Sequence, residues 1–252
     1  MALEEKVTPL PKREGLRRGI YLLPNLITTG ALFAGFYSII AAMSGDLEQA
    51  AIAIVIAGFM DSLDGRIARL TNTQSEFGVQ YDSLSDLVAF GVAPAVLMFS
   101  WILSDLGKLG WLVAFLYMAC AALRLARFNT APDAKVFYGL ASPAAAGTLA
   151  TTVWTWFDNM DQAIGFELAV PLAIMTALIA LLMVSNVRYY SPKHIDLNGR
   201  VPFFYMFVIV VLFGVVTVYP PGMLLTIGVV YSLSGPLTVL LRRKFPSATS
   251  AS

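Results

Sequence analysis

The sequence predicts an all-α membrane protein, a polytopic bundle of about eight transmembrane helices with the N- and C-termini in the cytoplasm. Three observations predict this fold class. Of the 252 residues, 58% are hydrophobic and 13% are charged, whereas a soluble domain has roughly 25% charged residues. Apolar segments of about 20 residues, the length that crosses a bilayer, recur along the chain. The basic residues gather in alternate connections between these segments, as the positive-inside rule describes.

Eight apolar segments account for most of the chain. The fifth is only weakly hydrophobic, but its small residues allow close helix packing in lipid, so we expect a buried span. The last two are separated by the sequence YPPG, which predicts a tight hairpin. In chain order, the expected spans are residues 21–43, 48–69, 83–104, 109–130, 138–158, 165–187, 201–218 and 221–241.

The distribution of basic residues supports this number of spans. With the N-terminus in the cytoplasm, every Lys and Arg except Lys108 falls in a cytoplasmic segment. A different number of spans would scramble this sorting. Residues 1–20 are polar and basic, and no small-residue cleavage site follows a short apolar region, so we expect no cleavable signal peptide. Residues 245–252 are predicted to form a flexible tail.

Composition also excludes several classes of function. The net charge is +1, so no bulk positive field favours nucleic acid, and we predict no nucleic-acid partner. The chain has one Cys and one His, which rules out a disulfide framework and the usual ligand sets for zinc. A metal site in this protein would therefore be built from oxygen ligands.

Four aspartates stand where the second apolar segment ends and the third begins. Asp61 and Asp64 are three residues apart and Asp82 and Asp86 are four apart, so each pair shares one face of a helix. Gly78 lies one turn before Asp82 on the same face. Grouped carboxylates at the membrane repel one another unless a cation binds, and oxygen ligands suit Mg²⁺ or Mn²⁺, with Ca²⁺ as a further candidate. The alternative interpretation is that these aspartates are helix caps and loop residues at the membrane surface.

The same stretch carries fixed residue types at fixed spacings. The pattern resembles the signature of the CDP-alcohol phosphotransferases, with every position filled: Asp61-x2-Asp64-Gly65-x2-Ala68-Arg69-x8-Gly78-x3-Asp82-x3-Asp86. The resemblance implies a six-helix core over residues 21–187, after a basic cytoplasmic segment at 1–20 and before two additional helices at 188–244. It also implies a homodimer and a reaction in which an acceptor hydroxyl displaces CMP from a CDP-linked lipid or alcohol.

The resemblance further implies roles for individual residues. Asp61, Asp64 and Asp82 would bind divalent metal as a two-ion site. Asp86 would complete that site and act as the catalytic base that accepts the proton of the attacking hydroxyl. The nucleotide would be bound by signature residues and by the PNLIT sequence of the first span, for which helix initiation is the alternative role. These nucleotide-binding residues are Asn25, Thr28, Asp64, Gly65, Ala68, Arg69 and Gly78.

Two further stretches indicate the acceptor. ACAALRLARFNTA at 119–131 and VFYGLASPAAAG at 136–147 resemble segments of the membrane-embedded bacterial phosphatidylserine synthases. Ala141 departs from that pattern, in which proline is usual before the serine. The resemblance implies CDP-diacylglycerol and L-serine as the substrates.

Two arginines and an asparagine are the candidate substrate-binding residues of these stretches. The resemblance implies that Arg124 or Arg127 binds the serine carboxylate, for which the arginine fork is suited, and that Asn129 assists. The other arginine would bind lipid phosphate. The alternative is that both arginines only extend to the membrane interface and obey the positive-inside rule.

Taken together, these features predict a bacterial inner-membrane enzyme whose active site faces the cytoplasm and whose partners include membrane lipid. It would transfer a phosphatidyl group from CDP-diacylglycerol to L-serine. Glycerol 3-phosphate or inositol phosphate remains an alternative acceptor, because a phosphorylated acceptor would also need arginines. A divalent-cation transporter is the alternative from another class, but it would place acidic residues near mid-membrane, and here they crowd one side.

Overall fold

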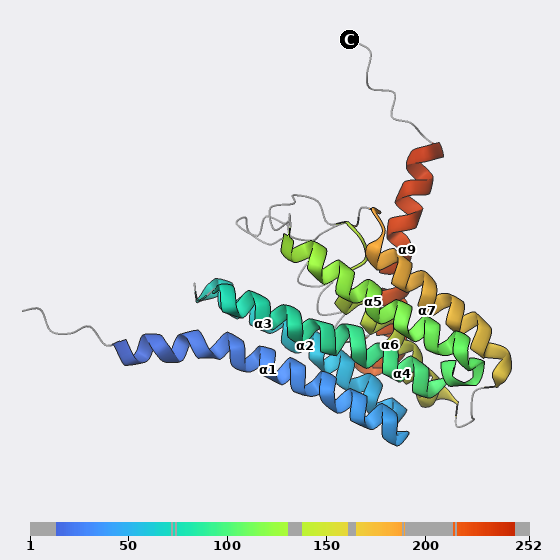
Figure 1. Cartoon of the computed structure of the whole chain (residues 1–252), viewed down its shortest axis with the longest axis horizontal. Coiled ribbons are helices and arrows are strands. Elements are labelled where there is room, and N and C mark those ends of the chain that lie inside the picture. Colours follow the sequence, from blue (N-terminus) through green and yellow to red (C-terminus); the bar gives the residue numbers. More distant parts are fainter. Residues whose placement is uncertain are drawn as a thin grey trace, which may run out of the picture.

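The computed structural model describes residues 14–71, 73, 75–130, 138–160, 165–187, 189, 214 and 216–244. Every regular element within these ranges is a helix (Figure 1), which confirms the all-α class. Residues 1–13, nearly all of the expected seventh span at 201–218 and the tail at 245–252 lie outside the described residues. What the sequence predicts for those segments stays a prediction.

Eight α-helices and three short helices make up the described part of the chain. The α-helices are α1 (Glu14–Ser44), α2 (Leu47–Leu70), α3 (Glu76–Asp86), α4 (Ala93–Trp101), α5 (Lys108–Thr130), α6 (Ser142–Asn159), α7 (Ala169–Val184) and α9 (Pro220–Lys244). The short elements are the π-helix η1 (Leu87–Val92) and the 3₁₀-helices η2 (Leu103–Leu106) and η3 (Phe166–Leu168). Helices α3 and α4 are joined by η1 into one continuous helical span.

Five helical segments in the described residues are long and apolar enough to cross a membrane. They are Leu23–Ser44, Glu76–Trp101, Lys108–Thr130, Phe166–Val184 and Pro220–Val239. Three expected spans remain, of which the seventh lies mostly outside the described residues. The other two form the helices α2 and α6, which are not long and apolar enough to count as candidate membrane spans. Helix α2 carries charged residues in its C-terminal half, and α6 is rich in Ala and Thr. Because α2 packs against α1 and α6, and α6 packs against α2 and α9, both need less lipid-facing apolar surface.

Two helix starts differ from the expected ones. Helix α1 begins at Glu14, so Pro24 lies inside the helix and does not start it; the helix-initiation interpretation of PNLIT is therefore wrong. The helix that carries the second aspartate pair begins at Glu76, before the expected start at residue 83. Ser75 caps it, accepting a hydrogen bond from the Gly78 amide at 3.0 Å.

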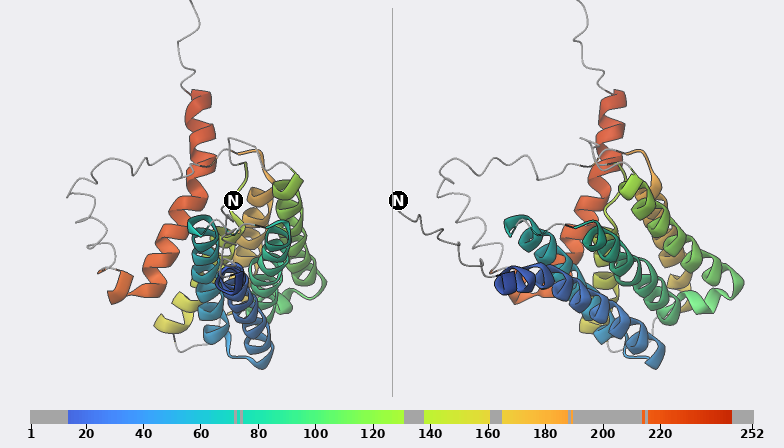
Figure 2. Two further views of the ribbon diagram at one scale, coloured as in Figure 1. Left: turned by 90° about the vertical axis from the view of Figure 1, so that its left-hand side faces the viewer. Right: turned by 60° about the vertical axis from the view of Figure 1, so that its left-hand side comes forward.

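The helices pack as neighbouring pairs (Figures 1 and 2). Helix α1 lies along α2 and also contacts α3 and α4, while α5 packs against α7. The chain reverses between α1 and α2 at Gly45, whose φ of 91° is a conformation that glycine adopts without strain. Helix α9 packs on α6, and its C-terminal end extends past the other helices.

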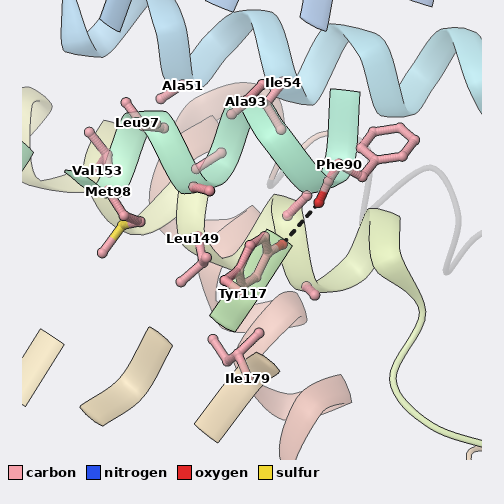
Figure 3. Close-up of a cluster of buried hydrophobic side chains, with 14 of the residues drawn as sticks. Ala51, Ile54, Phe90, Ala93, Leu97, Met98, Tyr117, Leu149, Val153 and Ile179 are labelled. Atoms are coloured by element: carbon pink, nitrogen blue, oxygen red, sulfur yellow. Dashed lines mark hydrogen bonds between the residues drawn. The ribbon is translucent and has the colours of Figure 1, made fainter. Parts of the chain in front are cut away.

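The core forms where η1, α4 and α6 meet their neighbours (Figure 3). Phe90, Leu97, Tyr117 and Leu149 are almost completely buried there. Pro94 has no N–H to donate to the carbonyl of Phe90, four residues earlier. The buried Tyr117 hydroxyl donates to that carbonyl instead, at 3.2 Å. This bond gives the buried Phe90 carbonyl a donor in place of the N–H that Pro94 lacks.

Helix α1 approaches η1 closely at one glycine. A Cβ atom on Gly35 would stand 2.7 Å from the Cα of Ala89, so only glycine fits there. Polar contacts also join α1 to α3: the Ser85 hydroxyl donates to the Thr28 carbonyl at 3.2 Å, and the Thr29 and Tyr81 hydroxyls are hydrogen-bonded at 2.9 Å. Together these contacts fix the position of the second aspartate pair relative to α1.

Candidate active site

Three carboxylates from two helices converge at one point. Asp61 and Asp64 belong to α2 and Asp82 to α3, and one oxygen of each lies within 4.8 Å of the others. Asp64 is only 4% exposed, and the Thr28 hydroxyl of α1 donates to its Oδ2 at 2.7 Å. This all-oxygen donor set fits a hard divalent cation, and the hydroxyl orients the most buried of its members.

The fourth aspartate adjoins this group. Asp86 ends α3, one turn after Asp82, and its carboxyl lies beside that of Asp61. All four aspartates lie within continuous helix, and Asp86 makes no side-chain cap, so the interpretation as caps and loop residues is wrong. The strongest charges acting on Asp82 are those of Asp64 and Asp61. A bound cation would relieve the repulsion within such a cluster.

A cavity of about 360 Å³ opens beside the three carboxylates. Its walls come from α1, α2, α3 and the C-terminal end of α5, and Asp82 also contributes to them. The structure brings together here all the residues expected to contact nucleotide: Asn25, Thr28, Asp64, Gly65, Ala68, Arg69 and Gly78. A motif spread over three helices thus forms one concave surface next to the candidate metal ligands.

Two glycines of the motif line the cavity without a side chain that would project into it. A Cβ on Gly78 would stand 3.1 Å from the Ser75 hydroxyl and 3.5 Å from Asn25 Oδ1, so this corner leaves little space for a larger residue. At Gly65 the nearest atom to such a Cβ is the end of the Arg69 side chain, at 3.8 Å. Arg69 Nε donates to the Gly65 carbonyl at 2.8 Å, which holds its guanidinium along α2 and against the cavity.

Sequence reasoning missed several residues of this cavity. Thr73, Ser75, Val79 and Phe128 also line it. Ser75 carries a usable signal, because a serine three residues before Gly78 at the start of a helix is a typical N-cap. Phe128 belongs to the RLARFN sequence, but nothing in its spacing indicates that the end of α5 reaches the cavity between α1 and α3.

The structure separates the two candidate arginines of α5. Arg124 is partly buried, and its Nη1 donates to the hydroxyl of Ser142, the first residue of α6, at 2.8 Å. Ser142 is fully buried. The preceding Ala141 has φ −62°, a value that proline also adopts. The departure from proline at this position therefore leaves the local backbone shape unchanged.

Arg127 and Asn129 have other partners. Arg127 Nη2 donates to Asn186 Oδ1 at 2.9 Å, and its guanidinium lies 5.6 Å from the centre of the Tyr138 ring. Asn129 exchanges hydrogen bonds with the Ser83 hydroxyl of α3, at 3.0 and 3.2 Å. Asn129 therefore joins the end of α5 to the helix that carries Asp82 and Asp86.

A second, mostly apolar cavity of about 560 Å³ lies between α2, α6 and α9. It borders a different face of α2 from the first cavity. Its lining is aliphatic and aromatic apart from a few polar side chains, which include Ser62, Arg66 and Tyr231. The carboxylate-bearing part of α2 thus separates a polar cavity from an apolar one.

This combination defines a class of protein: a helical membrane protein with a carboxylate cluster between a polar and an apolar cavity. The chain belongs to the CDP-alcohol phosphatidyltransferase family, whose model matches residues 21–234. That match includes most of α9.

Individual relatives support this family assignment. The chain is 36% identical over 197 residues to a CDP-diacylglycerol–serine O-phosphatidyltransferase of Helicobacter pylori, covering 77% of this chain and 80% of the relative. A protein of the same name from Methanocaldococcus jannaschii is 36% identical over 182 residues, with 72% and 80% covered. An archaetidylserine synthase of Methanothermobacter thermautotrophicus is 36% identical over 170 residues, with 66% and 69% covered.

Proposed function

We propose that this protein is a phosphatidylserine synthase that transfers the phosphatidyl group of CDP-diacylglycerol to L-serine, forming phosphatidylserine and CMP. One observation carries the proposal: the seven expected nucleotide-contacting residues line one cavity beside three converging carboxylates. The relatives that share the sequence over most of its length are named for serine transfer, which favours serine over glycerol 3-phosphate or inositol phosphate.

The donor is held on both faces of α2. The CDP group occupies the polar cavity, where Gly65 and Gly78 allow close approach and Arg69 faces its phosphates. The apolar cavity between α2, α6 and α9 offers walls for acyl chain. With the donor bound in this way, its pyrophosphate would lie at the carboxylate cluster.

Asp61, Asp64 and Asp82, whose oxygens converge, would hold the divalent metal, and Asp86 would complete the site. Mg²⁺ or Mn²⁺ would be the working ion, and Ca²⁺ is a further ion that these oxygens would accept. When bound, the metal neutralises the charge of the pyrophosphate as its bond breaks. Thr28 keeps the Asp64 carboxylate oriented toward the cluster.

In the chemical step, the serine hydroxyl oxygen attacks the phosphorus that carries the diacylglycerol. The bond from that phosphorus to the oxygen bridging to CMP breaks, and CMP leaves with the electron pair. Asp86 accepts the hydroxyl proton as general base. Its position one turn after Asp82 on α3, beside the cluster, supports this role. Arg124, Arg127 and Asn129 bind the acceptor and the lipid phosphate.

We further propose how the protein sits in the membrane. Eight spans place both termini in the cytoplasm, and the active site opens to the cytoplasmic face of the bacterial inner membrane. The distribution of Lys and Arg supports this orientation. The protein works as a homodimer, with residues 21–187 as its catalytic core and 188–244 as two additional helices.

Purified protein with CDP-diacylglycerol and Mn²⁺ or Mg²⁺ provides the test. L-serine, glycerol 3-phosphate and inositol phosphate are added in turn, and CMP release is measured. We expect release with serine alone. Release with another acceptor would keep the family and reject the serine assignment. Metal flux into liposomes that depends on Asp61 and Asp82, without release of CMP, would instead support a transporter.

A further inference from the structure

We infer that Tyr189 is a positioning residue for the donor lipid, because its hydroxyl holds α9 in place as a wall of the apolar cavity. The inference rests on the proposed function and deepens it, since it takes an acyl chain of CDP-diacylglycerol as the occupant of this cavity. It also gives a role to α9, which lies beyond the expected six-helix core.

The apolar cavity has the depth that an acyl chain needs. On α2, its lining extends from Ile54 to Arg66, a stretch of about 18 Å at a rise of 1.5 Å per residue. One leaflet accounts for about half of the ~30 Å hydrocarbon core of a bilayer. Ser62 and Arg66 are the polar residues of this stretch, and the lining residues of α2 toward Ile54 are apolar or glycine. A chain in the cavity would therefore have its polar end near Arg66.

Helix α9 supplies one wall of this cavity through Leu224, Ile227, Gly228 and Tyr231. The helix packs mainly on α6, and few of its residues are buried. At Gly228 the two helices approach closely, because a Cβ atom there would stand 2.6 Å from Thr148 Oγ1. Beyond this contact, the position of α9 depends on what holds its C-terminal half.

A hydrogen bond at a proline holds that half. Pro236 lies inside α9 and has no N–H to donate to the carbonyl of Ser232, four residues earlier. The hydroxyl of the buried Tyr189 donates to that carbonyl instead, at 3.0 Å. A Cβ atom on Gly235 would overlap the Tyr189 ring, so this glycine makes room for the approach. A tyrosine hydroxyl replaces a missing N–H in the same way at Pro94 in the core.

Tyr189 stands on an anchored segment. Two residues before it, the Val187 carbonyl accepts a hydrogen bond from the Gly139 amide at 2.9 Å. This bond ties the chain after α7 to the residues that precede α6. The Tyr189 ring also packs against the ring of Tyr231, with the ring centres 5.5 Å apart. Loss of the hydroxyl would therefore loosen α9 at a cavity-lining residue, while the segment that carries Tyr189 stays in place.

The test compares a long-chain donor with a short-chain donor. CMP release with serine is measured for the purified protein, with dioleoyl or dihexanoyl CDP-diacylglycerol in the same detergent. Tyr189→Phe should raise the KM for the dioleoyl donor about 2- to 10-fold, the usual effect of one hydrogen bond. The KM for serine and kcat should stay near wild type. The KM for the dihexanoyl donor should change little, because a short chain makes few contacts with α9.

Tyr37→Phe is the matched control, because that hydroxyl bonds Gln49, outside the cavity. It should leave the KM for both donors unchanged.

Pro236→Ala tests the role of the missing N–H. Alanine restores a donor for the Ser232 carbonyl, so the Tyr189 hydroxyl is no longer required there. In the Pro236→Ala background, Tyr189→Phe should therefore have little effect on the KM for the dioleoyl donor. Such non-additivity identifies the shared carbonyl as the link between the two residues. A general loss of packing would instead give the same effect in both backgrounds.

A second variant tests the position of α9 without changing Tyr189. Gly228→Ala would push α9 away from Thr148 and should also raise the KM for the dioleoyl donor more than that for the dihexanoyl donor. Gly165→Ala is its control, because a Cβ there would meet no atom of the described residues within 4 Å. If Tyr189→Phe does not fold, an unchanged KM for the dioleoyl donor in a folded Gly228→Ala protein would overturn the inference.

The outcomes separate this inference from the proposed function. A wild-type protein that releases no CMP with serine from either donor would overturn the proposed function itself. With an active wild type, a Tyr189→Phe protein that shows no change, the same change with both donors, or a lower kcat alone would overturn only the role of Tyr189. An effect that persists in full in the Pro236→Ala background would equally reject that role.

Discussion

The two sides of the candidate active site are built in different ways. The donor side consists of the cavity residues of α1, α2 and α3, and most of them come from a single stretch, residues 61–86. On the proposed acceptor side stand Arg124, Arg127 and Asn129, and Arg124 joins α5 to Ser142 of α6 through one hydrogen bond. The donor side is thus specified by many residues and the acceptor side by few. This difference suggests that the acceptor can change through a few substitutions while the donor chemistry stays the same.

The comparison predicts that donor-side changes abolish reaction with every acceptor. The largest effect is expected for Asp64→Asn, which removes a charge from the three-carboxylate group and leaves Thr28 facing an amide. Turnover should fall by about 100-fold or more, and Mn²⁺ binding should weaken with it. Titration calorimetry with Mn²⁺ and CMP release measure the two effects. Asp105→Asn is the control, because Asp105 is exposed in η2, outside the cluster.

Asp86→Asn should separate metal binding from chemistry. The asparagine keeps the shape of the side chain but cannot accept a proton, so we expect turnover to fall by about 10²- to 10⁴-fold. Mn²⁺ binding should be largely kept, because Asp61, Asp64 and Asp82 remain. The same titration and CMP assays apply. Turnover close to that of the wild type would show that Asp86 is not the base.

Thr28→Val is expected to have a smaller effect on the donor side. It removes the 2.7 Å hydrogen bond that orients Asp64 while keeping the side-chain shape. Loss of such a supporting bond typically weakens metal affinity about 10-fold or more. Thr29→Val is the matched control, because that hydroxyl bonds Asn25 and Tyr81 and not an aspartate. Equal Mn²⁺ affinities for the two variants would indicate that Thr28 does not support the metal site.

The sequence predicts more of the donor side of the site than of the acceptor side. The spacing of the aspartates places each pair on one helix face, and the structure confirms that Asp61, Asp64 and Asp82 meet. Helical periodicity suffices for each pair, because its members are close in sequence, whereas the meeting of the two pairs also depends on where α3 lies relative to α2. Ser142 was not predicted as a partner of Arg124, and neither was Phe128 as a wall of the nucleotide cavity. Both depend on how α5 packs against other helices, which periodicity does not specify.

Prediction of the fold from the sequence is limited in a similar way. The all-α class and most helices follow from hydropathy, yet α2 and α6 fall short of the measure for a membrane span. Hydropathy reports contact with lipid, and these two helices contact other helices instead. The π-helix at Leu87–Val92 was also not predicted. Pro94 was the available signal, but a proline indicates a disturbed helix without showing whether the helix ends, kinks or widens.

The smallest expected effect on catalysis is that of Tyr117→Phe. This variant tests whether the π-helix at Leu87–Val92 helps to position residues on both sides of the site. The variant leaves the Phe90 carbonyl buried without the Tyr117 hydroxyl, so the protein should lose about 1–3 kcal/mol of stability. The apparent Tm in detergent should fall, whereas Tyr37→Phe, at an exposed position, should leave it almost unchanged. Because Asp86 directly precedes the π-helix, relaxation of the turn would also move Asp86. A lower Tm with normal kcat would limit Tyr117 to stability; a lower kcat at temperatures where the variant is fully folded would show that the turn also positions Asp86 between donor and acceptor.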